Sequence, residues 1–243
     1  MRHYGIIGFP LLHSFSARYF NEKFATEAIE AEYSLYPIED LTIDNMRLNE
    51  LLDNLDGMNV TMPHKQAIIP YLERLDETAS GVGAVNVIYR RVGYNTDCIG
   101  FMDSLRPMLR DYDRKALVLG TGGASKAVCY GLRTLGIIPT LVSRTPRVGI
   151  LGYKDITPEI MQEHTIIVNC TPLGMLPDVN SCPAIPYEMI TARHLLFDCV
   201  YNPEETLFLR KGKAQGATTK NGMEMLTGQA KAAWRIWDEG VKE

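Results

Sequence analysis

Apolar and polar positions follow two different periods along the first hundred residues. Short apolar runs typical of strands occur at 4–8, 32–36 and 58–61. Between these runs, apolar side chains recur at helical spacing over 15–29 and 43–55, and Ser14 or Ser16 is a natural N-cap for the first helix. Strands that alternate with helices in this way predict a sheet covered by helices.

A second series of the same kind begins after a helix near 99–110. Its strands are expected at 115–120, 140–144, 165–171, 195–201 and 217–221. The connection between the second and third of these contains Pro and Gly and leaves room for one short helix, near 158–163. Such a connection is poor for a right-handed crossover of the usual length. The last helix, near 222–240, has Met225 and Ile236 on its apolar face, and the two series predict two domains.

Composition narrows the class of protein. The 243 residues are 46% hydrophobic and 22% charged, with a net charge of −4 and no run of one sign, so we expect no nucleic-acid or membrane partner. No apolar run reaches a secretory signal or the roughly 18 residues of a membrane span, and a cytoplasmic protein is expected. The five cysteines and five histidines are scattered, so we expect no disulfide framework and no metal.

The stretch "KALVLGTGGASKAV" (115–128) places three glycines between an apolar strand and a helix. Gly120, Gly122 and Gly123 would let the backbone turn sharply and approach a pyrophosphate held on the helix N-terminus. A plain tight turn is the alternative interpretation, which the strand before and the helix after make less favourable.

The end of the next strand, "SRTPR" (143–147), bears on the choice of cofactor. A protein that prefers NAD usually has an acidic side chain there for the ribose hydroxyls, and this stretch has none. Arg144 offers a planar fork of donors that suits a phosphate, which favours NADP. The alternative is that these arginines are ordinary solvated side chains.

Several polar residues stand where strands or helices end, and a packed core has no use for them. They are Ser14, Ser16, Asn59, Thr61, Lys65, Asn86, Asn95, Thr96, Asp97 and Gln229. Each has a local explanation as a helix cap or a turn residue. Together, their hydroxyls, amides, amine and carboxylate are suited to holding a small polyhydroxylated molecule.

At these residues the chain resembles the shikimate dehydrogenase family. The matching stretches are "GFPLLHSFS", "GMNVTMPHK", "GAVNV", "GYNTD", "GTGGASKA", "SRT", "NCTPLGM", "DCVYNPEETLFL" and "NGMEMLTGQA", in the family's order. The resemblance implies an α/β substrate domain (1–97 and 222–243), a Rossmann-like NADP-binding domain (98–221) and an active site in the cleft between them. It also implies reversible reduction of 3-dehydroshikimate to shikimate by NADPH, on the way to the aromatic amino acids.

The resemblance also implies residue roles. The catalytic pair is Lys65 and Asp97. Substrate contacts are implied for Ser14, Ser16, Asn59, Thr61, Lys65, Asn86, Asp97, Tyr201 and Gln229. Cofactor contacts are implied for Glu77, Gly120, Thr121, Gly122, Gly123, Ala124, Ser143, Arg144, Thr145, Cys199 through its backbone, and Gly222. The sequence leaves open whether the protein is a monomer or a homodimer.

The chemistry of the pair fits this reaction. Oxidation of a secondary alcohol releases a hydride and a proton, and the nicotinamide takes only the hydride. Desolvation and a nearby carboxylate act in opposite directions on a lysine, so Lys65 and Asp97 can be poised for proton transfer near neutral pH. The sequence does not decide which is the formal base, and a structural salt bridge would use the same two residues. His64 is expected to pack or to hold the loop.

Three departures from the family pattern leave alternatives open. Ala17 and Phe20 stand where Pro and His are common, Val87 replaces a usual hydroxyl residue, and the chain is shorter after "SRT". Arg147 is therefore only a candidate second ligand for the phosphate. The alternatives are a quinate or amino-shikimate dehydrogenase of the same family, and a regulator that binds NADP(H) without turnover.

Overall fold

The computed structural model describes residues 1–11 and 14–240, and its chain divides into two compact units. The first unit is Met1–Thr96 together with the chain from Gln229 onward, and the second is Asp97–Gly228. The last three positions of the segment expected at 222–243 lie outside the described residues. No helix in the described ranges is both long and apolar enough to cross a membrane.

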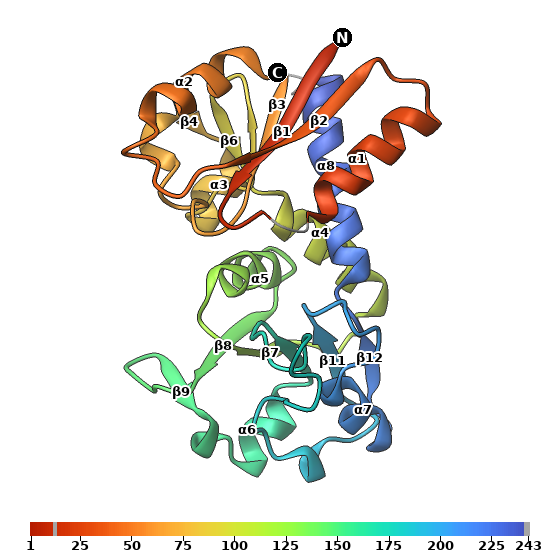
Figure 1. The fold of residues 1–243 in the computed structure, drawn as a ribbon. Helices are drawn as coiled ribbons and strands as arrows, with labels where there is room; N and C mark the ends of the chain where they lie inside the picture. Colours follow the sequence, from red (N-terminus) through yellow and green to blue (C-terminus); the bar gives the residue numbers. More distant parts are fainter. Residues whose placement is uncertain (12–13, 241–243) are drawn as a thin grey trace. The chain divides into compact units, whose positions relative to one another are not determined.

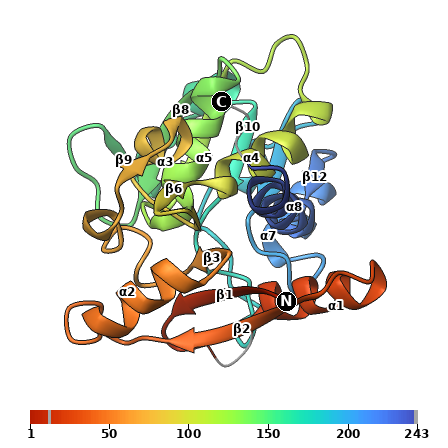
Figure 2. The same cartoon turned by 90° about the horizontal axis from the view of Figure 1, so that it is seen from above.

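The first unit is a mixed six-stranded sheet with helices on both faces. Its elements are β1 (Arg2–Gly8), α1 (Phe15–Thr26), β2 (Ala31–Pro37), α2 (Asn45–Asn54), β3 (Gly57–Val60), β4 (Arg74–Leu75), α3 (Glu77–Val82), β5 (Val87–Tyr89) and β6 (Val92–Tyr94). The strand order is β2-β1-β3-β5-β6-β4, with β1 parallel to β2 and β3, and β5 antiparallel to β3. Both views show β1 and β2 side by side with α1 next to β2 (Figure 1, Figure 2).

The strand period of two separates the two apolar cores of this unit. Tyr4 and Ile6 of β1 pack with residues of α1, β2 and the final helix, whereas Ile7 packs with residues of α2 and β3. Successive side chains of one strand thus reach opposite faces, and each face is covered by its own helices. The expected helices over 15–29 and 43–55 are α1 and α2, and Ser14 is the N-cap of α1.

The second unit is an all-parallel six-stranded sheet. Its elements are α4 (Thr96–Leu105), β7 (Lys115–Leu119), α5 (Gly123–Thr134), β8 (Ile138–Ser143), β9 (Ile150–Gly152), α6 (Pro158–Glu163), β10 (Ile166–Asn169), β11 (Leu195–Asp198), α7 (Leu207–Ala214), β12 (Thr218–Lys220) and α8 (Met223–Glu239), whose later turns join the first unit. The strand order β12-β11-β10-β7-β8-β9 is that of a dinucleotide-binding sheet. Helices cover both faces: residues of α4 and α5 lie in one core, and residues of α6 and α7 in the other.

The direction in which successive strands are added to the sheet reverses between β9 and β10. After β9 the chain returns through α6 and places β10 beside β7, on the other side of the first strand. The short helix expected near 158–163 is α6, but the same connection also holds β9, which its three residues did not reveal. The reversal creates the point at the carboxyl ends of β7 and β10 where ligands of such sheets bind.

Candidate active site

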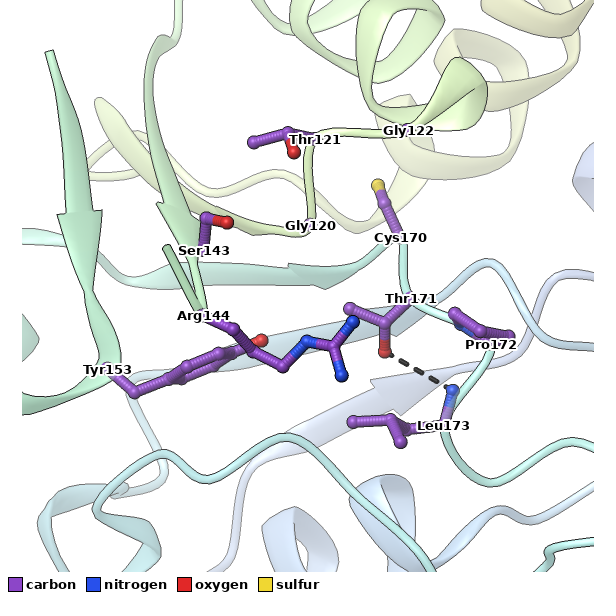
Figure 3. A pocket seen from close by; sticks show the side chains of 10 residues that line it. All are labelled: Gly120, Thr121, Gly122, Ser143, Arg144, Tyr153, Cys170, Thr171, Pro172 and Leu173. Atoms are coloured by element: carbon purple, nitrogen blue, oxygen red, sulfur yellow. Dashed lines mark hydrogen bonds between the residues drawn. The ribbon is translucent and has the colours of Figure 1, made fainter. Parts of the chain in front are cut away.

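A pocket of about 300 Å³ lies at the carboxyl ends of β7, β8 and β10, at the reversal point of the second sheet (Figure 3). Five of the residues implied by sequence line it: Gly120, Thr121, Gly122, Ser143 and Arg144. Five further lining residues were not expected: Tyr153, Cys170, Thr171, Pro172 and Leu173. The sequence signal for the last four was the motif "NCTPLGM", whose place beside β7 becomes evident only from the strand order.

The glycine loop has one position that requires glycine. Gly120 has a φ of 106°, which other residues rarely adopt, and a side-chain carbon there would lie 3.1 Å from Thr171 Cγ2. Gly122 caps α5 with an ordinary φ of −79°, and a carbon added at Gly122 or Gly123 would meet no atom within 4 Å. The first turn of α5, with Gly123 and Ala124, therefore offers its free N–H groups at the pocket.

We expect Gly120→Ala to weaken cofactor binding and to lower the free energy of unfolding by about 1–3 kcal/mol, because alanine must adopt the strained φ. The measurements are chemical denaturation and the Kd for NADP⁺ from protein fluorescence. Gly122→Ala is the matched control for the free energy of unfolding, since its position has an ordinary φ and open space. Equal losses of stability in the two variants would contradict the special role of Gly120.

Arg144 reaches into the pocket from the end of β8. Its guanidinium points across the cavity toward Thr171 and Leu173, and Tyr153 lines the same cavity (Figure 3). Burial raises the pKa of Tyr153, and the positive charge of Arg144 acts against this rise. The Ser143 hydroxyl accepts a hydrogen bond from the Thr145 amide at 3.2 Å, which holds the turn after β8. A positive charge in a pocket without an acidic lining residue suits a phosphate.

The loop after β10 is held by the Asn169 side chain. Its oxygen accepts hydrogen bonds from the Thr171 amide (3.0 Å) and hydroxyl (2.6 Å), while its nitrogen donates to Asp198 (2.9 Å). The Thr171 hydroxyl in turn accepts from the Leu173 amide at 3.3 Å (Figure 3). These bonds fix the wall of the pocket that faces Arg144.

Asp198, at the end of β11, is a fully buried carboxylate behind this wall. It accepts hydrogen bonds from the Thr206 hydroxyl at 2.6 Å and from the Val200 amide at 3.0 Å, besides the one from Asn169. Burial nevertheless raises the pKa of Asp198 from 3.8 to about 6, and these hydrogen bonds act in the opposite direction.

The raised pKa of Asp198 predicts a pH-dependent stability. The folded state holds this proton more tightly than the unfolded state, so the stabilisation is complete below about pH 4 and is lost as the pH rises through about 6. We expect wild type to lose on the order of 2–3 kcal/mol across this window relative to Asp198→Asn. Urea unfolding followed by circular dichroism from pH 4 to 7 measures it, with the exposed Asp178→Asn as control. Parallel curves for wild type and Asp198→Asn would contradict the prediction.

Cys199 and Gly222 meet next to the pocket without lining it. A side-chain carbon at Gly222 would lie 2.3 Å from the Cys199 carbonyl oxygen, so only glycine fits this approach. Cys199 Sγ lies 3.8 Å from Cys170 Sγ. The hydrogen bond between these two thiols, together with burial, raises the pKa of Cys170 and keeps its thiol neutral in the pocket wall. Tyr201, two residues after Cys199, is exposed.

The first unit joins part of the expected substrate set into one hydrogen-bonded chain. The Tyr33 hydroxyl donates to Asn59 Oδ1 at 2.7 Å, and Asn59 Nδ2 donates to the Asn86 carbonyl at 3.1 Å. The Asn86 side chain pairs with Thr96, accepting from its amide at 2.7 Å and donating to its hydroxyl at 3.0 Å. Tyr33 was not expected in the site, because nothing in its local sequence distinguishes it from other core tyrosines.

Other expected residues of the first unit have contacts of their own. Ser14 accepts a hydrogen bond from the Ala17 amide at 3.2 Å as the N-cap of α1, and Gln229 is buried in α8. The Thr61 amide donates to the Ile7 carbonyl, which holds the end of β3 beside β1. Glu77 is exposed in the first turn of α3, in the first unit, and is not a lining residue of the pocket beside Gly120.

The expected catalytic residues belong to different units of the chain. Lys65 is half-buried after β3, where its carbonyl accepts from the Val85 amide at 2.7 Å. Asp97 is half-buried in the first turn of α4 and is the first residue of the second unit. Their pairing stays a prediction. His64 is buried and donates through Nε2 to the Ile38 carbonyl at 2.6 Å, so it holds the loop as expected.

Comparisons with known proteins match one part of the chain to a family model and nearly the whole chain to curated relatives. The family model for the shikimate dehydrogenase substrate binding domain matches residues 6–88, which lie in the first unit and include Tyr33, Asn59 and Asn86. A shikimate dehydrogenase (NADP(+)) of Desulforamulus reducens is 35% identical, over 96% of this chain and 88% of the relative. One from Clostridium beijerinckii is 36% identical, over 98% of this chain and 93% of the relative.

A solved structure extends this likeness to the fold. Shikimate 5-dehydrogenase from Thermus thermophilus, determined in complex with NADP(H) and shikimate, superposes with a TM-score of 0.85 at 31% identity. The match covers 98% of this chain and 94% of that protein. The likeness therefore spans both units.

Proposed function

This chain belongs to the shikimate dehydrogenase family, and we propose that it catalyses the reversible, NADP-dependent reduction of 3-dehydroshikimate to shikimate. The observation that carries the proposal is the pocket beside Gly120, into which Arg144 points and which has no acidic lining residue. A phosphate on the adenosine ribose fits that charge, whereas the bare hydroxyls of NAD would leave it without a partner.

The protein's residues then have separate roles in the reaction. The bound cofactor supplies or accepts the hydride. Lys65 and Asp97 exchange the proton on the substrate oxygen, because the hydride alone does not complete the reaction. The remaining substrate contacts are those of Ser14, Ser16, Asn59, Thr61, Asn86, Tyr201 and Gln229. Cofactor contacts come from the pocket residues, with Gly123, Ala124, Thr145, Cys199, Gly222 and Glu77 as further candidates.

Substrate choice depends on the hydrogen-bonding groups of the first unit. A site that pairs each substrate hydroxyl rejects an analogue that leaves buried groups unpaired. Val87 lies directly across from Asn59 in the β3–β5 ladder and is fully buried. Because valine has no hydroxyl, this position offers no hydrogen bond to a substrate. Quinate and amino-shikimate remain the alternative substrates, and an NADP(H)-binding regulator is the alternative without catalysis.

The test is the absorbance of reduced nicotinamide after mixing the purified protein with shikimate or quinate, each with NADP⁺ or NAD⁺. We expect rapid reduction only with shikimate and NADP⁺. Turnover of quinate would favour the alternative substrate, turnover with NAD⁺ would contradict the role of Arg144, and no turnover would favour the regulator. A cytoplasmic location and a monomeric or homodimeric state are further proposals, the latter to be tested by light scattering.

A further inference from the structure

The hydroxyl of Tyr33 interacts with two expected substrate residues, Asn59 of β3 and Ser16 of α1. Tyr33 lies on β2 with 4% of its surface exposed, and its hydroxyl donates to Asn59 at 2.7 Å. Burial raises the pKa of Tyr33 well above its usual value, while a side-chain hydrogen bond with Ser16 acts against this rise. The phenol is therefore neutral and available as a donor.

The position of this phenol is fixed from several sides. The Asn21 side chain of α1 pairs with the Tyr33 backbone, donating to its carbonyl at 2.9 Å and accepting from its amide at 3.0 Å. The ring stacks on Phe20 with centroids 5.0 Å apart, and Trp237 lies 6.5 Å away. Helix and neighbouring rings thus hold the hydroxyl in place before any ligand arrives.

The bond from Tyr33 determines which way the Asn59 amide faces. With its oxygen accepting from Tyr33, its nitrogen donates to the Asn86 carbonyl at 3.1 Å. A flipped amide would set two oxygens against each other at Asn86. An amide has two donor hydrogens and two lone pairs, so this orientation leaves one N–H and one lone pair of Asn59 for a ligand hydroxyl.

We propose that Tyr33 is a positioning residue for the substrate, which acts by holding Asn59, and through it the Asn86 backbone, in the orientation that a substrate hydroxyl requires. This inference rests on the proposed shikimate dehydrogenase activity. The phenol itself need not touch the substrate. Its loss should reduce substrate binding more than the chemical step, because the groups that exchange the proton are elsewhere.

The test is Tyr33→Phe, which keeps the stacked ring and removes only the hydroxyl. We expect the KM for shikimate to rise roughly tenfold, since a buried hydrogen bond is lost and Asn59 is freed to rotate. The kcat and the KM for NADP⁺ should stay within about twofold of wild type. Tyr4→Phe is the matched control, because Tyr4 belongs to the same aromatic cluster but its hydroxyl interacts with Arg2.

A double-mutant cycle with Asn59→Ala separates positioning from a loss of stability. If Tyr33 acts through Asn59, Tyr33→Phe should add little to the KM of Asn59→Ala, whereas independent effects would multiply. The cycle is measured below the lowest Tm of the four proteins. Multiplying effects, or an unchanged KM in Tyr33→Phe, would overturn the proposal while shikimate turnover by wild type still supports the proposed function. Absence of that turnover would overturn both.

Discussion

Replacing Lys65 with alanine is expected to lower kcat by about 10²–10⁴-fold while the KM for shikimate changes far less. The reason is that the proton on the substrate oxygen must move as the hydride moves, so a group that exchanges it acts mainly in the transition state. Lys65 is half-buried, and its backbone is held by the Val85 amide. Steady-state rates with shikimate and NADP⁺ measure both parameters.

Two further variants make this result specific. Lys65→Arg keeps the positive charge but cannot give up its proton, so it should keep substrate binding better than Lys65→Ala and still turn over slowly. Lys154→Ala, at an exposed position without an assigned role, should leave both parameters unchanged. Turnover by Lys65→Ala equal to wild type would contradict the catalytic assignment, and a structural salt bridge would then be the better explanation.

Local patterns predicted the elements that bury a continuous apolar stripe. The strand at 115–120 is β7, because its run of apolar residues is itself the cause of the strand. The short helix near 158–163 is α6, which begins at Pro158 with Thr157 as its N-cap. The helices α3 and α7 and the short strands β4, β5 and β9 were not expected. A strand of two or three residues has too few side chains to show a period, and it forms only because its neighbour offers a ladder.

The site residues also fall into two groups, those that the local sequence reveals and those that it does not. Gly120, Ser143 and Arg144 could be found because each lies at the end of a recognisable strand and carries a distinctive side chain or none. Tyr33 and Tyr153 could not, since nothing in their local sequences distinguishes them from other tyrosines. The partner of Tyr33 is also far along the chain, because Tyr33 and Asn59 are 26 residues apart. Likewise, Thr171 becomes a pocket residue only because the strand order puts β10 beside β7.

The positive charge of Arg144 in the pocket predicts a large change in cofactor preference when it is removed. Arg144→Ala should raise the KM for NADP⁺ by roughly 10–100-fold, since hydrogen bonds to a charged group contribute about 1.5–3 kcal/mol, and should leave the KM for NAD⁺ nearly unchanged. Initial rates with shikimate at varied NADP⁺ and NAD⁺ provide the comparison. The change lies in binding, so kcat at saturating cofactor should be retained.

Arg147→Ala is the matched control for Arg144, because it removes the same charge three residues later. Arg147 is exposed and does not line the pocket, and its backbone pairs with Ile150 across the turn that leads into β9. We expect its removal to change the KM for NADP⁺ by less than about threefold, as for a screened surface charge. An equal rise in the KM for NADP⁺ in both variants would show that both arginines bind the phosphate. An equal loss of NAD⁺ and NADP⁺ in Arg144→Ala would instead show that the guanidinium supports the fold of the pocket and does not read the phosphate.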